Sequence, residues 1–457
     1  DWETAARRSL GLRTLESLTV ESHAGLAVSP LYTADDLPRG PLPAIPRDRV
    51  SWEACCTVDL REPEAAIRET MAAVSGGAAS CWFAVDRRSS SWSRLTAAVL
   101  AELLEATGGA PVYLDGRAVT PALAAVLAAA LRRRGAAAAD LRGGFDFDPL
   151  GTLAANGTMP WDLESCHQLM ADMVRWAEEH TAGMRAFAVS TLPYAKAGAD
   201  AAQELALAMA TAVEYLRRLE RAGVPPEPAC RRLRLIMPVG RDLFMETAKL
   251  RAARLLWASV ARACGAGPES HRLPLHAVSS PVTLTIRDPW VNVLRGTAQA
   301  YAAVIGGADV LTVLPFDSAV RRPDALARRL ALNTHNILRE ECHLDQVADP
   351  AHGSYFVERL THDLAAAAWA RFQRLEAAGG MAQQLQSGAV ARELAESQAR
   401  RRQAIATRRE PITGVSSYPL PDQAAVDRPG VDWRAVRDRA RRRLAACRGR
   451  AADELAQ

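Results

Sequence analysis

The stretch LRLIMPVGRDLFMETAKLRAARLLWASVARACGAGPESHRLPLHAVSS, residues 233–280, joins two short apolar runs through one long helical segment. The runs Leu233–Val239 and Leu273–Val278 are apolar at nearly every position, which is typical of parallel strands buried on both faces. Between them, Asp242–Cys264 carries apolar residues at helical spacing. The stretch therefore predicts a strand–helix–strand unit of the kind that builds parallel sheets.

The same alternation extends in both directions along the chain. Six further apolar runs are predicted strands: Ala54–Leu60, Cys81–Asp86, Pro111–Leu114, Leu141–Phe145, Met184–Ser190 and Ala308–Leu314. Seven further segments are predicted helices: Glu62–Ser75, Ser93–Thr107, Pro121–Arg134, Asp162–His180, Ala199–Ala222, Pro289–Ile305 and Pro323–Leu344. Strict alternation of eight strands with eight helices predicts an α/β fold, a (β/α)8 TIM barrel, and a doubly wound open sheet is the alternative.

The regions before and after this alternation have a different character. Residues 1–50 are rich in proline, aspartate and arginine, so we expect an extended N-terminal arm with a short helix near its start. Residues 51–350 are then the barrel. In residues 351–457 we expect a C-terminal helical extension, with helices at Leu360–Glu376, Met381–Ser387, Ala389–Arg408 and Asp432–Ala446.

Composition excludes several classes of protein. The 56 basic and 52 acidic residues give a net charge of +4, which is too balanced to indicate a nucleic-acid partner. The eight cysteines are scattered without C-x-x-C spacing, so they predict neither a zinc site nor a disulfide framework, and they fit a reducing cytoplasm. The absence of an 18-residue apolar stretch and of a signal-peptide pattern also favours a cytoplasmic, soluble protein.

Candidate site residues come from the expected geometry of a barrel, because function sits at the carboxyl ends of its strands. The polar residues and the glycine at or near these ends are Asp59, Asp86, Asp115, Asp146, Ser190, Tyr194, Lys196, Gly240, His276, Ser279, Ser280 and Asp317. For Asp59, Asp86 and Asp115, capping of the following helix is the favoured interpretation. No metal or cofactor ligands are predicted.

Three of these residues are candidate catalytic groups: Tyr194, Lys196 and His276. Lys196 is one of only two lysines in the chain and follows a predicted strand directly, so it could act as a base or bind an anion. An ordinary loop lysine is the alternative. His276 could be a general acid or a hydrogen-bonded interior histidine. The candidate substrate-binding residues are Ser190, Ser279 and Ser280.

Long ordered motifs run through nearly the whole chain. They are VSPLYTADDLP (28–38), DPLGTLA (148–154), AGADAAQELALAMATAVEYLR (197–217), AKLRAARLLWA (248–258), TIRDPWVNVLRGTAQAYAAVIGGADVLTVLPFD (285–317), DPAHGSYFVERLTHDLAAAAW (349–369), GGMAQQLQSG (379–388) and REPITGVSSYP (409–419). With these motifs the chain resembles the methylmalonyl-CoA mutase family of adenosylcobalamin-dependent acyl-CoA mutases, closest to its small (β) subunits. The resemblance implies a barrel that threads acyl-CoA along its axis, and arms that wrap a partner subunit.

The sequence departs from the family's catalytic pattern at three places. The D-x-H-x-x-G motif of the C-terminal cobalamin-binding domain does not occur up to Gln457. The pattern Y-H-M-Q-E-A-G-A is LPYAKAGA at residues 192–199. The pattern R-T-H-S-Q-T-S-G is PLHAVSSP at residues 274–281, where His276 and Ser280 match while Pro274 and Val278 replace the arginine and the glutamine.

The resemblance therefore implies a small-subunit-like component of an acyl-CoA carbon-skeleton isomerase that is not catalytic alone. It would bind no cofactor alone, with adenosylcobalamin reached through a large catalytic subunit or a stand-alone cobalamin-binding protein; a homodimer is a further option. One alternative is a cobalamin-independent enzyme acting on CoA or carrier-protein thioesters. The other is a non-catalytic module that binds such thioesters.

The barrel interior separates these hypotheses. In a purely structural partner we expect Leu192, Met237 and Val278 to fill the axis that a catalytic barrel leaves open for pantetheine. In an acyl-thioester enzyme, Lys196 and His276 should converge on one cavity within reach of a shared ligand.

Overall fold

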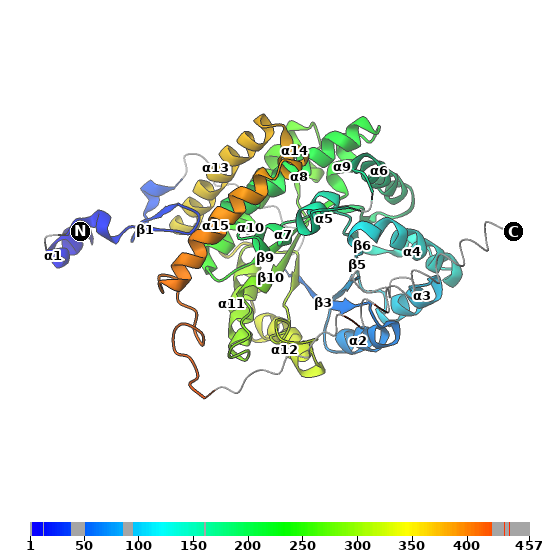
Figure 1. Cartoon of the computed structure of the whole chain (residues 1–457), viewed down its shortest axis with the longest axis horizontal. Helices are drawn as coiled ribbons and strands as arrows, with labels where there is room; N and C mark the ends of the chain where they lie inside the picture. The colour runs from blue at the N-terminus through cyan, green and yellow to red at the C-terminus, as the bar shows by residue number, and fades with distance from the viewer. Residues whose placement is uncertain are drawn as a thin grey trace.

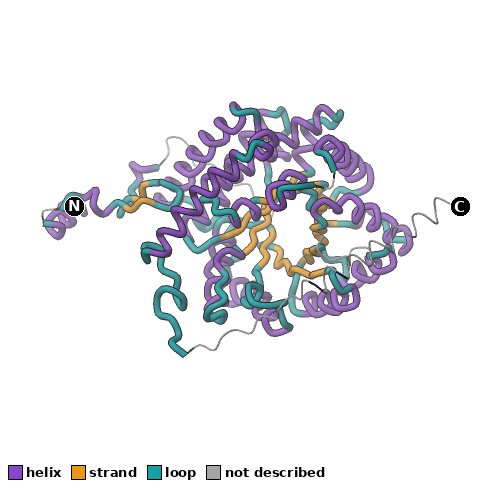
Figure 2. The backbone as a smooth tube through the Cα atoms, in the orientation of Figure 1, coloured by secondary structure: helices purple, strands orange, loops and turns teal. Residues whose placement is uncertain are grey.

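The computed structural model describes residues 2–11, 13–37, 51–85, 95–159 and 161–422, and the single positions 434 and 438. A ring of parallel strands surrounded by helices forms its centre (Figure 1, Figure 2). The strands of this sheet are β3 (Glu53–Asp59), β4 (Ser80–Ala84), β5 (Val112–Asp115), β6 (Arg142–Phe145), β7 (Gly183–Arg185), β8 (Phe187–Ser190), β9 (Leu233–Val239), β10 (Leu275–Ser279) and β11 (Val310–Thr312). Their order, β7-β6-β5-β4-β3-β11-β10-β9-β8, follows the chain around the ring.

One piece of chain joins the two ends of this sheet. β7 pairs with β6, β8 pairs with β9, and only Ala186 separates the two strands. The backbone N–H of Ala186 donates to the carbonyl oxygen of Arg232 at 2.9 Å, so the chain changes neighbours at this residue. The prediction of one continuous strand over Met184–Ser190 is wrong, because the segment must change hydrogen-bond partner where the ring closes. The predicted (β/α)8 barrel is confirmed.

The long helices around the ring lie where the sequence predicts helices, with ends shifted by a few residues. They are α2 (Pro63–Ser75), α3 (Ala97–Ala106), α4 (Thr120–Arg134), α6 (Leu163–His180), α8 (Ala201–Arg221), α10 (Leu243–Ala263), α11 (Val291–Ile305) and α12 (Ala325–Asn336). The predicted helix Pro323–Leu344 is too long. After α12 the chain widens into the π-helical turn η8 (Ile337–Glu341), in which Cys342 N–H donates to the carbonyl oxygen of Ile337.

Short helices at the strand ends were not predicted, because they span too few residues to show a helical period. The α-helical ones are α5 (Pro149–Asn156), α7 (Leu192–Lys196) and α9 (Pro226–Arg231), each with a proline in its first turn. The 3₁₀ turns within and around the barrel are η4 (Arg117–Val119), η5 (Ala138–Asp140), η6 (Pro268–His271) and η7 (Pro281–Thr283). α5 and α7 follow β6 and β8, so they lie at the carboxyl ends of the strands.

The segment before the barrel contains α1 (Trp2–Leu10), η1 (Leu15–Leu18), an unpredicted antiparallel pair β1 (Val20–Glu21) with β2 (Ala27–Val28), and η2 (Ala34–Asp36). α1 buries none of its residues and projects from one side of the molecule (Figure 1). After the barrel come α13 (Tyr355–Ala377), α14 (Gly380–Gln386) and α15 (Ala389–Ala406). α13 packs against α8 and α10. The predicted helix Asp432–Ala446 lies outside the described ranges.

Two apolar clusters form the core. The larger one lies between the strands and the surrounding helices, and the smaller one lies inside the ring. The inner cluster consists of Cys55, Trp82, Tyr113, Ala188, Ile236, Val278 and Val310, with Leu192 and Leu314 packed against it. Val278 and Leu192 thus help to fill the axis, as expected. The expectation for Met237 is wrong: side chains alternate along β9, so Ile236 points inward and Met237 belongs to the outer cluster.

Across the described residues, no helix is long and apolar enough to cross a membrane.

Candidate functional site

A small cavity, here called the mouth cavity, opens at the carboxyl ends of the barrel strands. Its volume is about 90 Å³, which is space for roughly three water molecules. Four of the predicted strand-end residues, Asp115, Asp146, Ser190 and Lys196, line it. The remaining polar residues around it are Arg117, Asp148 and Thr152. The mouth cavity therefore offers one amine, one guanidinium and three carboxyl groups to a very small ligand.

Burial controls the charge state of these groups. It raises the pKa of Asp115, and it raises the pKa values of Asp146 and Asp148 to about 6. Desolvation and the nearby Arg117 guanidinium lower the pKa of Lys196, while the Asp115 carboxylate acts in the opposite direction. Groups shifted toward neutral pH in this way can exchange protons with a bound molecule.

Asp148 has a structural task that explains the DPLGTLA motif. Its carboxylate caps α5 by accepting the N–H of Gly151 at 2.9 Å, and it also accepts the N–H of Ser190 at 2.9 Å. The hydroxyl of Tyr215 donates to the same carboxylate at 2.5 Å. A Cβ atom at Gly151 would stand 2.1 Å from Asp148 Oδ2, so the motif requires glycine there. Asp148 thus joins α5, β8 and α8.

The floor of the mouth cavity closes the barrel axis. Trp82 and Ile236 line the cavity and belong to the inner apolar cluster. Next to them, Arg234 forms a buried bidentate ion pair with Asp146. Its Nε donates to Oδ1 at 2.6 Å, and its Nη2 donates to Oδ2 at 2.7 Å. The guanidinium carbon of Arg234 lies 3.9 Å from the centre of the Tyr113 ring. This arrangement fills the axis with one ion pair surrounded by aromatic and apolar side chains.

His276 lies on the other side of this floor. Its Nε2 is 2.8 Å from Thr312 Oγ1. Its ring lies edge-on to the Trp82 ring, with the two ring centres 4.9 Å apart. Burial, followed by the charge of Arg234, holds its pKa well below the usual value, so the ring is neutral. Its Nδ1 is buried and has no hydrogen-bond partner in the described part of the protein.

The structure does not bring Lys196 and His276 together. Lys196 lines the mouth cavity, whereas His276 lines a second cavity at the amino-terminal ends of the strands. Trp82, Ile236 and the Arg234–Asp146 pair lie between these two sides. The shared ligand position that an enzyme using both residues requires is therefore lacking in the described structure.

The other predicted site residues lie outside the mouth cavity. Tyr194 lies in the outer core, where burial raises the pKa of its hydroxyl. Ser279 Oγ accepts the N–H of Leu314 at 2.7 Å, and Ser280 Oγ caps η7 by accepting the N–H of Val282. Asp59 pairs with Arg61, and Asp317 pairs with Arg321.

Two strand-end candidates remain. Gly240 lies near Glu246, whose Oε1 would stand 2.7 Å from an added Cβ atom. Asp86 falls outside the described residues.

The second cavity, here called the arginine cavity, has a volume of about 250 Å³. Five arginines line it against two acidic residues, Glu53 and Asp309: Arg142, Arg185, Arg234, Arg254 and Arg272. Arg254 pairs with Asp309 at 2.9 Å, and Tyr113 donates its hydroxyl proton to Glu53 at 3.0 Å. The excess of guanidinium groups suits a ligand with several negative charges.

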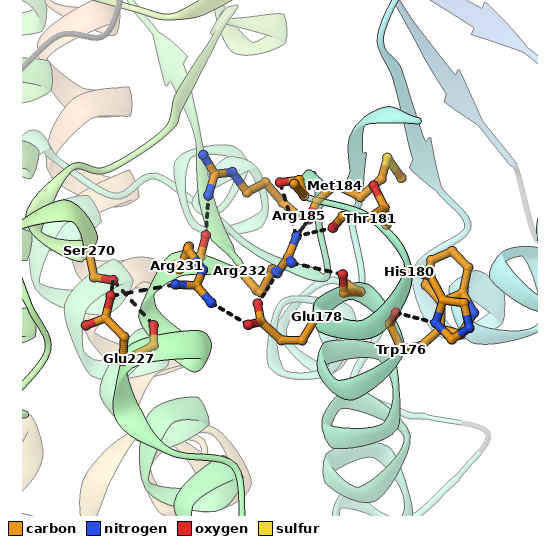
Figure 3. Close-up of polar contacts among 12 residues, drawn as sticks. Trp176, Glu178, His180, Thr181, Met184, Arg185, Glu227, Arg231, Arg232 and Ser270 are labelled. Carbon is orange, nitrogen blue, oxygen red and sulfur yellow. Dashed lines mark hydrogen bonds and ion pairs between the residues drawn. The ribbon is translucent and has the colours of Figure 1, made fainter. Parts of the chain in front are cut away.

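A polar network fixes one wall of the arginine cavity (Figure 3). Arg232 donates to the carbonyl oxygens of Thr181 and Met184, both at 2.7 Å, and pairs with Glu178. Arg231 also pairs with Glu178, and its carbonyl oxygen accepts a hydrogen bond from Arg185. These contacts hold the start of β7 and orient Arg185.

Sequence reasoning missed this cavity because it searched only the carboxyl ends of strands. A signal was nevertheless present: Arg142, Arg185 and Arg234 each stand near the first residue of a predicted strand, and Arg272 directly precedes one. Parallel strands place these starts at the same end of a barrel.

The described residues contain no group of three or more histidine, cysteine, aspartate or glutamate side chains placed to hold a metal ion.

The family model and the relatives found by sequence agree on one family. Residues 110–457 match the sequence model of methylmalonyl-CoA mutase. The methylmalonyl-CoA mutase small subunit of Streptomyces virginiae is 39% identical over 429 residues, which cover 92% of this chain and 68% of that protein. The methylmalonyl-CoA mutase small subunit of Propionibacterium freudenreichii subsp. shermanii is 31% identical over 440 residues, which cover 92% of this chain and 68% of that protein. Among solved structures, dihydropteroate synthase from Stenotrophomonas maltophilia is 18% identical with a TM-score of 0.37, and covers 64% of this chain and 94% of that one.

Proposed function

This chain belongs to the methylmalonyl-CoA mutase family, and we propose that it acts as a small-subunit-type partner of a catalytic acyl-CoA mutase subunit rather than as a mutase by itself. The observation that carries this proposal is the filled barrel axis. A pantetheine arm needs a continuous channel, whereas the Arg234–Asp146 ion pair and the inner apolar cluster occupy that space. The mouth cavity of about 90 Å³ is also far below the roughly 300–1,000 Å³ of ordinary ligand sites.

We further propose that a partner chain holds the adenosylcobalamin on which this family depends. The cofactor supplies the radical chemistry of the rearrangement. In the mouth cavity the residues present do not suit a cobalt ligand, since its lining offers carboxylates, Lys196 and Arg117 but no histidine among the described residues. His276, the candidate imidazole near the axis, is buried behind Trp82.

The test compares the purified chain with the same chain co-expressed with a large mutase subunit from its own organism. We expect a stable complex on gel filtration, with conversion of methylmalonyl-CoA to succinyl-CoA by the complex only. We also expect no cobalamin absorbance to remain on the chain alone after desalting. Product formation by the isolated chain with added cofactor, or failure to form any complex, would contradict the proposal.

The arginine cavity favours a second candidate function, the binding of a CoA thioester without turnover. CoA carries several phosphate charges. Arg234 and Arg254 are already paired with Asp146 and Asp309, which leaves Arg142, Arg185 and Arg272 facing one further acid of the lining, Glu53. Here CoA would bind from the amino-terminal side without passing through the axis. Calorimetric titration should then show CoA binding while uncharged pantetheine does not bind.

The double variant Arg142→Gln/Arg272→Gln separates this function from nonspecific attraction. We expect it to weaken CoA binding at least tenfold, while Arg133→Gln on the exposed face of α4 leaves the affinity unchanged. Equal affinity of all three proteins for CoA would rule out this candidate and leave the partner role untouched.

A further inference from the structure

A gap in the barrel wall lies between β3 and β11. The two strands pair only at their starts, where Val310 aligns with Glu53 and Leu311 with Ala54. Beyond this point β3 continues to Asp59 along β4 alone, and the chain after β11 passes through Pro315, which has no N–H to donate. The two strands are therefore not joined by backbone pairing over their carboxyl halves.

A cavity of about 570 Å³, here called the side cavity, covers this gap. Its walls are the facing sides of α2 and α12, and its floor is formed by β3 and the residues after β11. Most of the wall is apolar and small, and five alanines contribute to it: Ala65, Ala72, Ala73, Ala325 and Ala331. Leu332, Val58, Val313 and Pro315 complete the apolar lining.

The space is therefore suited to an apolar body. The cavity is open to water at its entrance, and covering its apolar lining with an apolar chain removes that surface from water, which is favourable. Its volume lies inside the range of ordinary small-molecule sites.

The floor of the side cavity is polar but uncharged. Thr57 lines it, and its Oγ1 is buried without a hydrogen-bond partner in the described ranges. Cys55 and Cys56 also line it, and burial raises the pKa of the Cys55 thiol to about 12. The inner end of the cavity therefore holds no ionised group that would repel an apolar chain.

The entrance, in contrast, carries positive charge. Arg68 of α2 and Arg328 and Arg329 of α12 line the cavity together with one acid, Glu69. Glu69 is already paired with Arg322 at 3.2 Å and with Arg328 at 3.5 Å. Arg68 and Arg329 are exposed and have no ion pair or hydrogen bond within the part of the chain that the structure describes.

From this distribution we propose that the side cavity binds a small amphiphilic carboxylate. Its apolar chain would lie between α2 and α12, and its carboxylate would lie at the entrance between Arg68 and Arg329. The small apolar lining selects the chain, and the two arginines select the charge. This site is separate from the mouth cavity and from the arginine cavity, and it does not depend on the proposed partner function.

Calorimetric titration of the full chain with decanoate tests the proposal. We expect one saturable site, and at least tenfold weaker binding of decyltrimethylammonium, which has the same chain with the opposite charge. The double variant Arg68→Gln/Arg329→Gln should bind decanoate roughly tenfold more weakly, because it removes two ion pairs. Ala331→Phe should abolish binding by filling the cavity.

Matched controls distinguish the side cavity from other sites. Ala125→Phe on the exposed face of α4 and Arg142→Gln in the arginine cavity should keep the decanoate affinity. If Ala331→Phe fails to fold, as judged by thermal unfolding, the double arginine variant decides. The proposal is overturned if titration with decanoate gives no saturable heat signal. The same result is expected if another part of this chain occupies the cavity, and that outcome also overturns the proposal. Equal binding of both amphiphiles by all variants overturns it as well.

Discussion

At the scale of single residues, the carboxylate of Asp148 connects local geometry to the pH dependence of stability. Burial raises its pKa to about 6 from 3.8, so the folded state holds this proton more tightly than the unfolded state. The resulting contribution to the free energy of unfolding is present in full below about pH 4 and is lost as the pH rises through 6. Its size is up to roughly 3 kcal/mol, since one pKa unit corresponds to about 1.4 kcal/mol.

Urea unfolding between pH 4 and pH 7 measures this contribution. Asp148→Asn should be less stable than the parent protein, because it loses part of the cap of α5, and its stability should fall less over this interval. The exposed Asp140→Asn is the control and should keep the parent slope. An identical slope for parent and Asp148→Asn would show that this carboxyl does not titrate as expected.

The ion pair between Arg234 and Asp146 is a second residue-scale feature. Both side chains are almost fully buried, so Arg234→Met leaves an uncompensated carboxylate inside the barrel. We expect this variant to lose about 3–5 kcal/mol of unfolding free energy. The double variant Arg234→Met/Asp146→Leu should recover most of that loss, because no buried charge remains unpaired. A double-mutant cycle by urea unfolding checks both values, and a loss below 1 kcal/mol in the single variant would argue against the buried pair.

At the scale of elements, β6 depends on one glycine for its pairing with β5. Gly143 has a φ of 124°, and an added Cβ atom would stand 2.0 Å from the carbonyl oxygen of Val112. Gly143→Ala should therefore destabilise the protein by more than about 3 kcal/mol, since both strain and a backbone collision oppose it. Gly135→Ala is the matched control, because this residue also has positive φ but has open space around it. The control should cost only about 1 kcal/mol, and similar thermal unfolding of the two variants would contradict the expectation.

At the scale of the whole molecule, the N-terminal segment contributes little to the stability of the barrel. α1 and η1 bury none of their residues, and α1 projects away from the barrel (Figure 1). Deletion of residues 1–19 should leave the thermal unfolding temperature nearly unchanged. Under the proposed partner function, the same deletion should weaken association with the large subunit at least tenfold, as measured by surface plasmon resonance. Unchanged association would remove this segment from the interface.

The local pattern of the sequence was sufficient to predict the strands and helices of the barrel. Leu233–Val239 has the same bounds in the structure as in the prediction, because a short apolar run buried on both faces is visible without knowledge of its neighbours. The long helices were equally predictable from their apolar period. The resemblance to the mutase family also rested on sequence alone, and the family comparisons confirm it.

Only the tertiary structure decided which side chains share a cavity. Because both faces of these strands are apolar, the period of two does not tell which face is inside, and Met237 was placed on the wrong one. The break at Ala186 arises from ring closure, a contact between segments far apart in the sequence. The separation of Lys196 from His276 has the same physical origin. It depends on Trp82, Ile236 and the Arg234–Asp146 pair meeting in the axis, and these residues come from three different strands and their ends.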